Sequence, residues 1–119
     1  MILDTSTWIE FFQGSEKGKK VWTYLKSNKC HTSIITLSEI TSFCIRNKLD
    51  YINRINRIKL HSQIIPINEE ICILAGKLSS NKNKLGMVDS IIYSTALMYK
   101  LTLLTKDKDF TGMENVEIL

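Results

Sequence analysis

The chain begins MILDTSTWIEFF (residues 1–12), and this stretch contains the change from strand to helix that decides the fold. Residues 1–3 are consecutive apolar residues, which predicts a short buried strand. Residues 6–14 carry aromatic side chains at helical spacing and end in Gly14, which predicts a short helix. Asp4 lies at the junction. Aspartate is a good helix N-cap and also a metal ligand, and its neighbours alone leave both roles open.

Strands and helices are predicted to alternate along the rest of the chain. Further strands are expected at residues 30–35, 63–67, 101–105 and 116–119. Pro66 favours an edge position for the strand at 63–67. Helices are expected at residues 15–29, 36–49, 51–60, 68–80 and 87–100, with polar loops at 81–86 and 106–110. This alternation predicts an α/β fold built from βαβ units, with a parallel sheet covered by helices on both faces.

Length and composition are those of one globular domain. We expect a single domain over residues 1–119, in which 44% of the residues are hydrophobic and 24% are charged. The net charge of +4 is compatible with a polyanionic partner but does not require one.

The cysteines and the apolar runs bear on where the protein acts. Cys30, Cys44 and Cys72 show no C-x-x-C spacing, and the two histidines are not spaced with them as in a zinc site. We interpret the cysteines as small buried residues in a reducing compartment. No signal segment and no membrane-length apolar run is evident, so a cytoplasmic protein with no membrane association is expected.

Several carboxylates follow strands or open helices that leave the carboxyl edge of the predicted sheet, which is where ligands bind in such folds. These residues are Asp4, Glu39, Glu69, Glu70, Asp89, Asp107 and Asp109. Each also has a structural explanation. "TLSE" (residues 36–39) matches a capping box with Thr36 as the N-cap and Glu39 in the first helical turn. The others suit helix dipoles or turns.

Carboxylates that converge in one cleft repel one another unless a cation neutralises them. Asp4 follows an apolar strand, and Asp89 lies beside a long apolar helix face, where an isolated charge is costly. An all-oxygen ligand set favours Mg²⁺ or Mn²⁺ over zinc. Because Mg²⁺ sites usually recruit phosphate oxygens, phosphodiester chemistry is the expected reaction class.

Four segments, in this order, resemble PIN-domain proteins, and more narrowly the VapC-type toxins of toxin–antitoxin pairs. The segments are LDTSTWIEFF (3–12), TLSEI (36–40), MVDSIIYSTAL (87–97) and LTLLTKDKDF (101–110). The resemblance implies a three-layer α/β/α fold with a central parallel sheet of about five strands. It also implies a Mg²⁺- or Mn²⁺-dependent endoribonuclease that cleaves single-stranded RNA and leaves a 5′-phosphate and a 3′-hydroxyl.

Roles for individual residues follow from the same resemblance. It implies an acidic cluster of Asp4, Glu39, Asp89 and Asp107, in which the three aspartates hold the metal and Glu39 positions or deprotonates water. Ser6 is expected to support the site. In the family the last acidic role falls at the position of either Asp107 or Asp109.

Contacts to RNA and to protein partners are also expected. Four loop lysines flank the site and are candidates for RNA binding or for a merely solvated surface: Lys82, Lys84, Lys106 and Lys108. Further candidates for RNA or partner contacts are Arg46, Arg54 and Arg57. The resemblance implies a homodimer and a small antitoxin across the active cleft. Trp8, Phe12 and Trp22 either belong to such an interface or pack on the sheet.

Other functions share parts of this sequence pattern. A PIN-fold RNA-processing nuclease outside a toxin–antitoxin pair and a non-catalytic nucleic-acid- or partner-binding module both remain alternatives. A phosphoacceptor signalling domain requires an acidic pair near the chain start and a lysine after a late strand. Here the start offers only Asp4, and Lys106 is a poor match.

Overall fold

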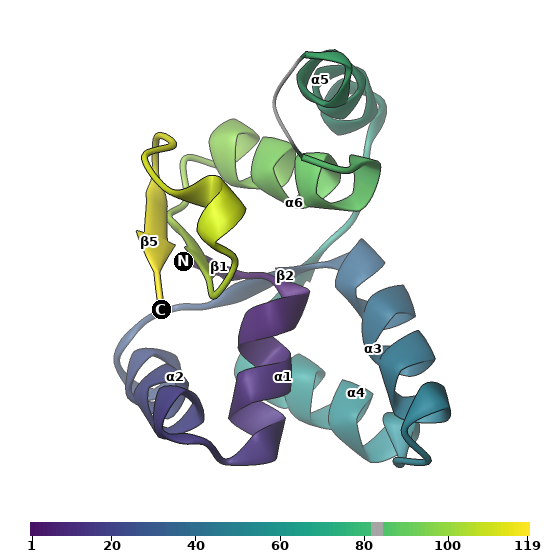
Figure 1. The fold of residues 1–119 in the computed structure, drawn as a ribbon, viewed down its shortest axis with the longest axis vertical. Helices are drawn as coiled ribbons and strands as arrows, with labels where there is room; N and C mark the ends of the chain where they lie inside the picture. Colours follow the sequence, from purple (N-terminus) through teal and green to yellow (C-terminus); the bar gives the residue numbers. More distant parts are fainter. Residues whose placement is uncertain (82–84) are drawn as a thin grey trace.

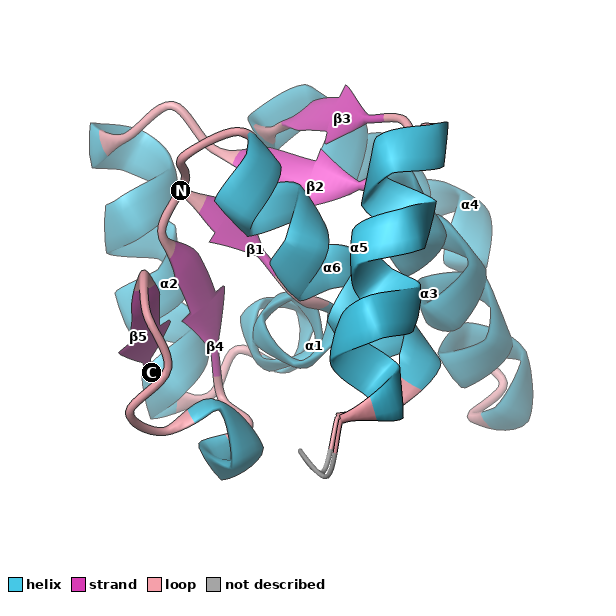
Figure 2. Cartoon of the chain, turned by 90° about the horizontal axis from the view of Figure 1, so that it is seen from above, coloured by secondary structure: helices cyan, strands magenta, loops and turns pink. Residues whose placement is uncertain are grey.

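The computed structural model describes residues 1–81 and 85–119, and its centre is a twisted five-stranded parallel sheet in the order β3-β2-β1-β4-β5 (Figure 2). The strands are β1 (Ile2–Leu3), β2 (His31–Ser33), β3 (Gln63–Ile65), β4 (Leu103–Thr105) and β5 (Val116–Ile118). The first strand is central, and the strand followed by Pro66 lies at an edge, as predicted.

Helices cover both faces of this sheet (Figure 1). They are α1 (Thr5–Gln13), α2 (Glu16–Ser27), α3 (Ile34–Arg46), α4 (Tyr51–His61), α5 (Glu69–Ser80), α6 (Met87–Met98) and the short 3₁₀ helix η1 (Lys108–Phe110). The first four helices lie on one face. On the other face lie α6 and η1, with α5 packed against α6. The predicted three-layer α/β/α architecture is confirmed.

The central strands β1 and β4 are buried on both of their faces, as parallel strands commonly are. Leu3 and Leu104 point into a core with α1 to α4, whereas Ile2 and Leu103 point into a second core with α6 and η1. This alternation explains why residues 1–3 form a continuous apolar run. Within the described residues, no helix combines the length and apolar character needed to cross a membrane.

The start of α3 differs from the prediction. A strand over residues 30–35 was expected, but β2 ends at Ser33, whose hydroxyl caps the helix by accepting from the Ile35 N–H at 3.4 Å. Thr36 is therefore inside the first turn, and the capping box over residues 36–39 is wrong. The β-branched Ile34 and Ile35 have the composition of a strand, but β2 pairs with β3 only as far as Ser33.

Three smaller differences concern helix ends and a cysteine. The helix expected to reach residue 49 ends at Arg46, and the loop predicted at 106–110 contains η1. Cys72 is exposed, contrary to prediction, because it lies on the solvent side of α5. Cys30 and Cys44 are buried as predicted.

The turn between α1 and α2 brings two backbones into close contact. Gly14 ends α1 in the left-handed conformation (φ 65°). A Cβ on Gly18 of α2 would lie 2.2 Å from the backbone oxygen of Glu10. Glycine is therefore required at position 18 for α2 to pack against α1.

We predict that Gly18→Ala lowers the free energy of unfolding by about 1–3 kcal/mol, because the new methyl group overlaps backbone atoms that cannot rotate away. Gly76→Ala in α5 is the matched control, because a Cβ there meets nothing within 4 Å. It should raise stability by about 0.5–1 kcal/mol through helix propensity. Urea unfolding of both variants checks the pair, and equal effects would contradict the close packing at Gly18.

Candidate functional site

Four carboxylates from four separate elements line one pocket of about 260 Å³: Asp4, Glu39, Asp89 and Asp107. Asp4 follows β1, Glu39 lies on α3, Asp89 is in the first turn of α6 and Asp107 follows β4. These are the four carboxylates that were expected to meet. They converge because the carboxyl ends of β1 and β4 lie side by side and α6 begins at the same edge of the sheet.

Asp4 is only 3% exposed and accepts four hydrogen bonds. Its Oδ1 accepts from Ser6 Oγ at 2.8 Å and from the Thr7 N–H and Thr7 Oγ1, each at 2.9 Å. Its Oδ2 accepts from Thr105 Oγ1. Oδ1 caps α1, while Oδ2, with a single donor, is the oxygen better able to accept another ligand.

Glu39 lies in the second turn of α3, because that helix begins at Ile34 rather than after Thr36. The prediction that it opens the helix is wrong, but it lines the pocket nonetheless. Its Oε1 accepts a hydrogen bond from Thr5 Oγ1, which orients the carboxylate and links α3 to α1.

Asp107 and Asp109 are distinguished by their positions. Asp107 lines the pocket, and its Oδ1 accepts from the Asp109 N–H at 2.9 Å, which begins η1. Asp109 is exposed and does not line the pocket. The Asp107 N–H donates to Thr105 Oγ1 at 2.9 Å, so Thr105 contacts both Asp107 and Asp4.

The electrostatic cost of this arrangement falls on Asp89. Burial of its side chain, followed by the charges of Asp107, Asp4, Glu39 and Asp109, raises the pKa of Asp89 from 3.8 to about 6. Repulsion among like charges is the condition that a bound cation relieves.

The basic candidates occupy different environments. Lys106 pairs with Glu10 of α1 instead of extending freely from its loop, and Lys108 is exposed. Arg46 lines the acidic pocket. Lys82 and Lys84 lie outside the described residues.

Two acidic candidates do not join the pocket. Glu69 and Glu70 open α5 as expected, but both are exposed and neither lines the pocket.

The hydroxyl groups that hold the carboxylates were only partly anticipated. Ser6 was expected to support the site, and it does contact Asp4. No role in holding the carboxylates was predicted for Thr5 or Thr7, and Thr105 was not singled out. The signal for Thr105 is its position as a polar residue that ends an otherwise apolar strand and is fully buried.

The aromatic residues of α1 and α2 divide between core and surface. Trp8 is fully buried and donates from Nε1 to Thr32 Oγ1 at 3.1 Å, whereas Trp22 is 40% exposed. Phe11 and Phe12 are partly buried, and the guanidinium of Arg57 lies 5.0 and 5.3 Å from their ring centroids. Packing on the sheet therefore explains Trp8 but not Trp22.

The donor set suits a hard divalent cation, because carboxylate and hydroxyl oxygens line the pocket and no sulfur or imidazole does so. Over residues 1–81 and 85–119, no three His, Cys, Asp or Glu side chains are close enough together to hold one ion as they stand. The four carboxylates thus line one pocket, but their side chains are farther apart than ligands of a single ion.

Solved structures of known proteins share this fold. A toxin–antitoxin complex from Klebsiella pneumoniae has a TM-score of 0.80 and 25% identity, covering 98% of this chain and 94% of that chain. VapBC2 from Rickettsia felis, bound to a DNA fragment from its promoter, has a TM-score of 0.77 and 18% identity, covering 99% and 96%. VapC20 from Mycobacterium tuberculosis, a toxin that cleaves the sarcin–ricin loop, has a TM-score of 0.75 and 15% identity, covering 95% and 94%.

The sequence comparisons identify the family. A search of curated protein sequences finds no significant match. The family model of the PIN domain matches residues 1–115, nearly the whole chain. Together with the shared fold and the four carboxylates at the carboxyl edge of the sheet, this match shows that the chain belongs to the PIN-domain family.

Proposed function

We propose that residues 1–119 form a single PIN-like domain that acts as a Mg²⁺- or Mn²⁺-dependent endoribonuclease on single-stranded RNA. We further propose that it is the toxin of a VapBC-type toxin–antitoxin pair in the cytoplasm. PIN domains are typically nucleases, which supports the first proposal. The observation that carries it is the convergence of Asp4, Glu39, Asp89 and Asp107 on one pocket.

Three aspartates are the proposed metal ligands: Asp4, Asp89 and Asp107. Asp4 would use Oδ2, because Oδ1 already accepts three hydrogen bonds. The raised pKa of Asp89 supports this assignment, since a cation beside Asp89 favours its ionised form. When bound, the cation supplies positive charge that polarises the phosphodiester and stabilises the charge developing during hydrolysis.

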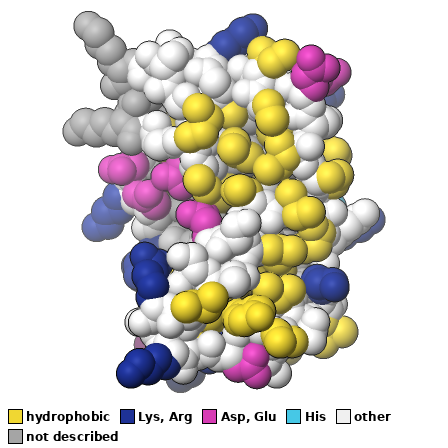
Figure 3. Space-filling model, turned by 90° about the vertical axis from the view of Figure 1, so that its right-hand side faces the viewer, with side chains coloured by type: hydrophobic (Ala, Val, Ile, Leu, Met, Phe, Trp, Pro, Cys, Tyr) yellow, Lys and Arg dark blue, Asp and Glu magenta, His cyan; other side chains and the backbone are white. Residues whose placement is uncertain are grey.

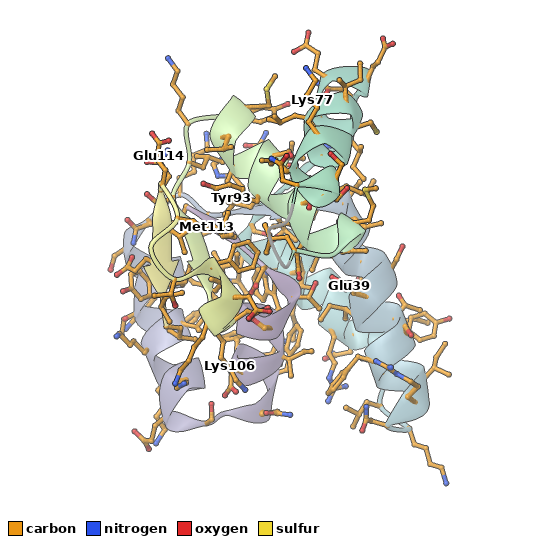
Figure 4. All side chains as sticks on the ribbon, turned by 45° about the horizontal axis from the view of Figure 1, so that its top comes forward. Glu39, Lys77, Tyr93, Lys106, Met113 and Glu114 are labelled. Atoms are coloured by element: carbon orange, nitrogen blue, oxygen red, sulfur yellow. The ribbon has the colours of Figure 1, made fainter. Side chains whose placement is uncertain are left out.

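Glu39 is the proposed group that positions or deprotonates the attacking water. Its Oε1 is engaged by Thr5, so we assign the water to Oε2. Glu39 extends from α3 (Figure 4), and it lines the same pocket as the strand-end aspartates. In-line attack on the phosphorus would leave a 5′-phosphate and a 3′-hydroxyl.

Arg46 is the cation best placed to contact the RNA backbone, because it lines the same pocket as the four carboxylates. Lys108, exposed on η1, is a second candidate. Both contacts would neutralise phosphate charge, so RNA binding should weaken as the salt concentration rises.

We predict that Asp4→Asn, Asp89→Asn and Asp107→Asn each reduce Mn²⁺-dependent RNA cleavage by about a hundredfold or more, because each removes a charge directed at the reaction centre. Asp109→Asn is the matched control on the same turn and should retain most of the activity. Cleavage of a labelled single-stranded RNA with 5′-end mapping measures the effect. Undiminished cleavage by folded Asp4→Asn or Asp89→Asn protein would refute the assignment.

Asp89 should also oppose stability in the metal-free protein. The pKa of Asp89 is about 6 in the folded protein, and its ordinary value is 3.8. Below pH 3.8 the carboxyl group is protonated in both the folded and the unfolded state, so its ionisation does not destabilise the fold. The destabilisation grows as the pH rises towards 6 and is complete above it. We predict that Asp89→Asn raises the unfolding free energy by about 1–2 kcal/mol at pH 7.5, a value reduced for the partial exposure of the side chain.

Urea unfolding in EDTA at pH 7.5 and pH 4 checks this prediction, and the gain should largely disappear at the lower pH. Glu69→Gln removes an exposed carboxylate of α5 and should change stability little at either pH. A gain of equal size at both pH values would mean that the effect of Asp89→Asn is unrelated to ionisation.

Protein partners are proposed from two exposed surfaces. A band of apolar side chains runs over the face that carries α3 and parts of α5 and α6, beside a group of acidic side chains (Figure 3). Exposed residues of these helices include Ile34, Ile45, Ile73 and Met87. We propose this band as the homodimer interface.

The second surface is proposed to hold a small antitoxin. It is formed by the exposed Trp22 and Arg57 with the partly buried rings of Phe11 and Phe12. Similar folds have been solved in toxin–antitoxin complexes, which supports a partner of this kind.

We predict that Trp22→Ala weakens binding of the cognate antitoxin by about tenfold or more, because partly exposed aromatic anchors carry much of the affinity at interfaces. Calorimetric titration with a purified candidate antitoxin measures the change. Thr23→Ala, on the same helix and also exposed, is the control. Equal affinities for the two variants would exclude Trp22 from the interface.

A further inference from the structure

One buried carboxylate takes no part in the acidic pocket. Glu10 of α1 is 7% exposed and accepts hydrogen bonds from the Lys106 ammonium and the Ser15 hydroxyl. The Lys106 hydrogen bond is the main cause that lowers the pKa of Glu10, followed by that from Ser15. Burying a carboxylate costs free energy of folding unless the charge is paired, so the ion pair of Glu10 needs a structural or functional reason.

Its partner lies immediately before Asp107, a proposed metal ligand. The backbone N–H of Lys106 donates to Ser6 Oγ at 3.2 Å, and Ser6 Oγ donates in turn to Asp4 Oδ1 at 2.8 Å. In Figure 4 the Lys106 side chain extends from the end of β4 towards α1 and α2. Lys106 is thus attached to α1 through both its backbone and its side chain.

The next residue is held from the other side. The Asp107 N–H donates to Thr105 Oγ1, which donates to Asp4 Oδ2. The turn from Thr105 to Asp107 therefore has three attachments to the start of the chain: Asp4, Ser6 and Glu10. The Glu10–Lys106 pair is the outermost of these and the only ionic one among the described residues.

We infer that Glu10 is a positioning residue, whose ion pair with Lys106 holds the turn after β4 so that Asp107 faces the pocket beside Asp4. The inference rests on the proposed function for its metal-dependent consequence. It assigns a structural role to Lys106, one of the loop lysines considered for RNA contact, because its ammonium group pairs with the buried carboxylate of Glu10. Glu10 itself contacts neither metal nor substrate.

A double-mutant cycle on Glu10→Gln and Lys106→Met tests this pair. The readout is the Mn²⁺ concentration that gives half of the metal-induced rise in melting temperature, measured without RNA. Each single variant should raise this concentration about tenfold, as loss of a group supporting a metal ligand does. The double variant should be no worse than either single variant, because both remove the same interaction. Lys106→Arg, which keeps the pair, should restore Mn²⁺ affinity.

Matched controls are available on α2, where Glu16 and Lys19 form an exposed pair at 3.0 Å. Glu16→Gln and Lys19→Met make the same chemical changes at the surface and should leave the Mn²⁺ midpoint unchanged. If Glu10→Gln is unfolded without metal, Lys106→Met carries the test, because the Lys106 side chain is about half exposed and its loss leaves Glu10 hydrogen-bonded to Ser15.

Hydrogen exchange of the Asp107 amide gives a readout that needs no metal. That amide should exchange about tenfold faster in both pair variants than in the wild type or the Glu16→Gln control, since a loosened turn exposes its hydrogen bond to Thr105. Unchanged exchange together with an unchanged Mn²⁺ midpoint would overturn the inference, and so would a higher KM for RNA in Lys106→Met alone. A wild type with no Mn²⁺ response but with the predicted exchange difference would refute the proposed function and leave the positioning role intact.

Discussion

The carboxylate of Asp4 is the contact on which the rest of the site depends. It is almost fully buried and satisfied by donors from Ser6, Thr7 and Thr105, which belong to α1 and β4. A buried charge needs such partners, because unpaired burial costs several kcal/mol. The end of β1, the start of α1 and the end of β4 must therefore meet at one point. Thr7 strengthens the junction, since its hydroxyl lies within hydrogen-bond distance of both Asp4 Oδ1 and the Leu104 carbonyl, at 2.9 and 2.8 Å, and its one proton can serve either acceptor.

Helix capping and ligand binding are compatible roles for this residue. Oδ1 faces the first turn of α1 and takes the capping hydrogen bonds, while Oδ2 faces the end of β4. Under the proposed function, Oδ1 would cap the helix and Oδ2 would bind the metal. The same division recurs at Asp107, whose Oδ1 starts η1 while the residue lines the pocket.

Bringing four carboxylates together in the folded state is electrostatically unfavourable and lowers the stability of the protein. That cost is visible in the raised pKa of Asp89. Within the described residues, no side chain donates a hydrogen bond to Asp89, whereas hydroxyl groups orient Asp4 and Glu39. Functional sites commonly sacrifice stability in this way. The large apolar cores on both faces of the sheet supply the stability that makes the arrangement tolerable.

Much of this architecture could be predicted from local sequence. Alternating strands and helices and the end of α1 at Gly14 depend on residues a few positions apart, and both were predicted correctly. The convergence of Asp4, Glu39, Asp89 and Asp107 was also predictable, because a parallel sheet brings its strand ends to one edge. The start of α3 was not, since Ser33 and Thr36 are both good caps and only the extent of β2–β3 pairing selects Ser33.

The sequence by itself therefore determined the order of the elements and limited the acidic candidates at the sheet edge to seven residues, four of which line the pocket. Only the tertiary structure decided which groups hold them: that Thr105 contacts both Asp4 and Asp107, that Asp107 rather than Asp109 lines the pocket, and that Lys106 pairs with Glu10. The physical reason is the distance along the sequence between the residues that interact. Caps and periodicity act within a helical turn, whereas the Thr105–Asp4 and Lys106–Glu10 contacts join residues about a hundred positions apart, which meet only after β1 and β4 have paired.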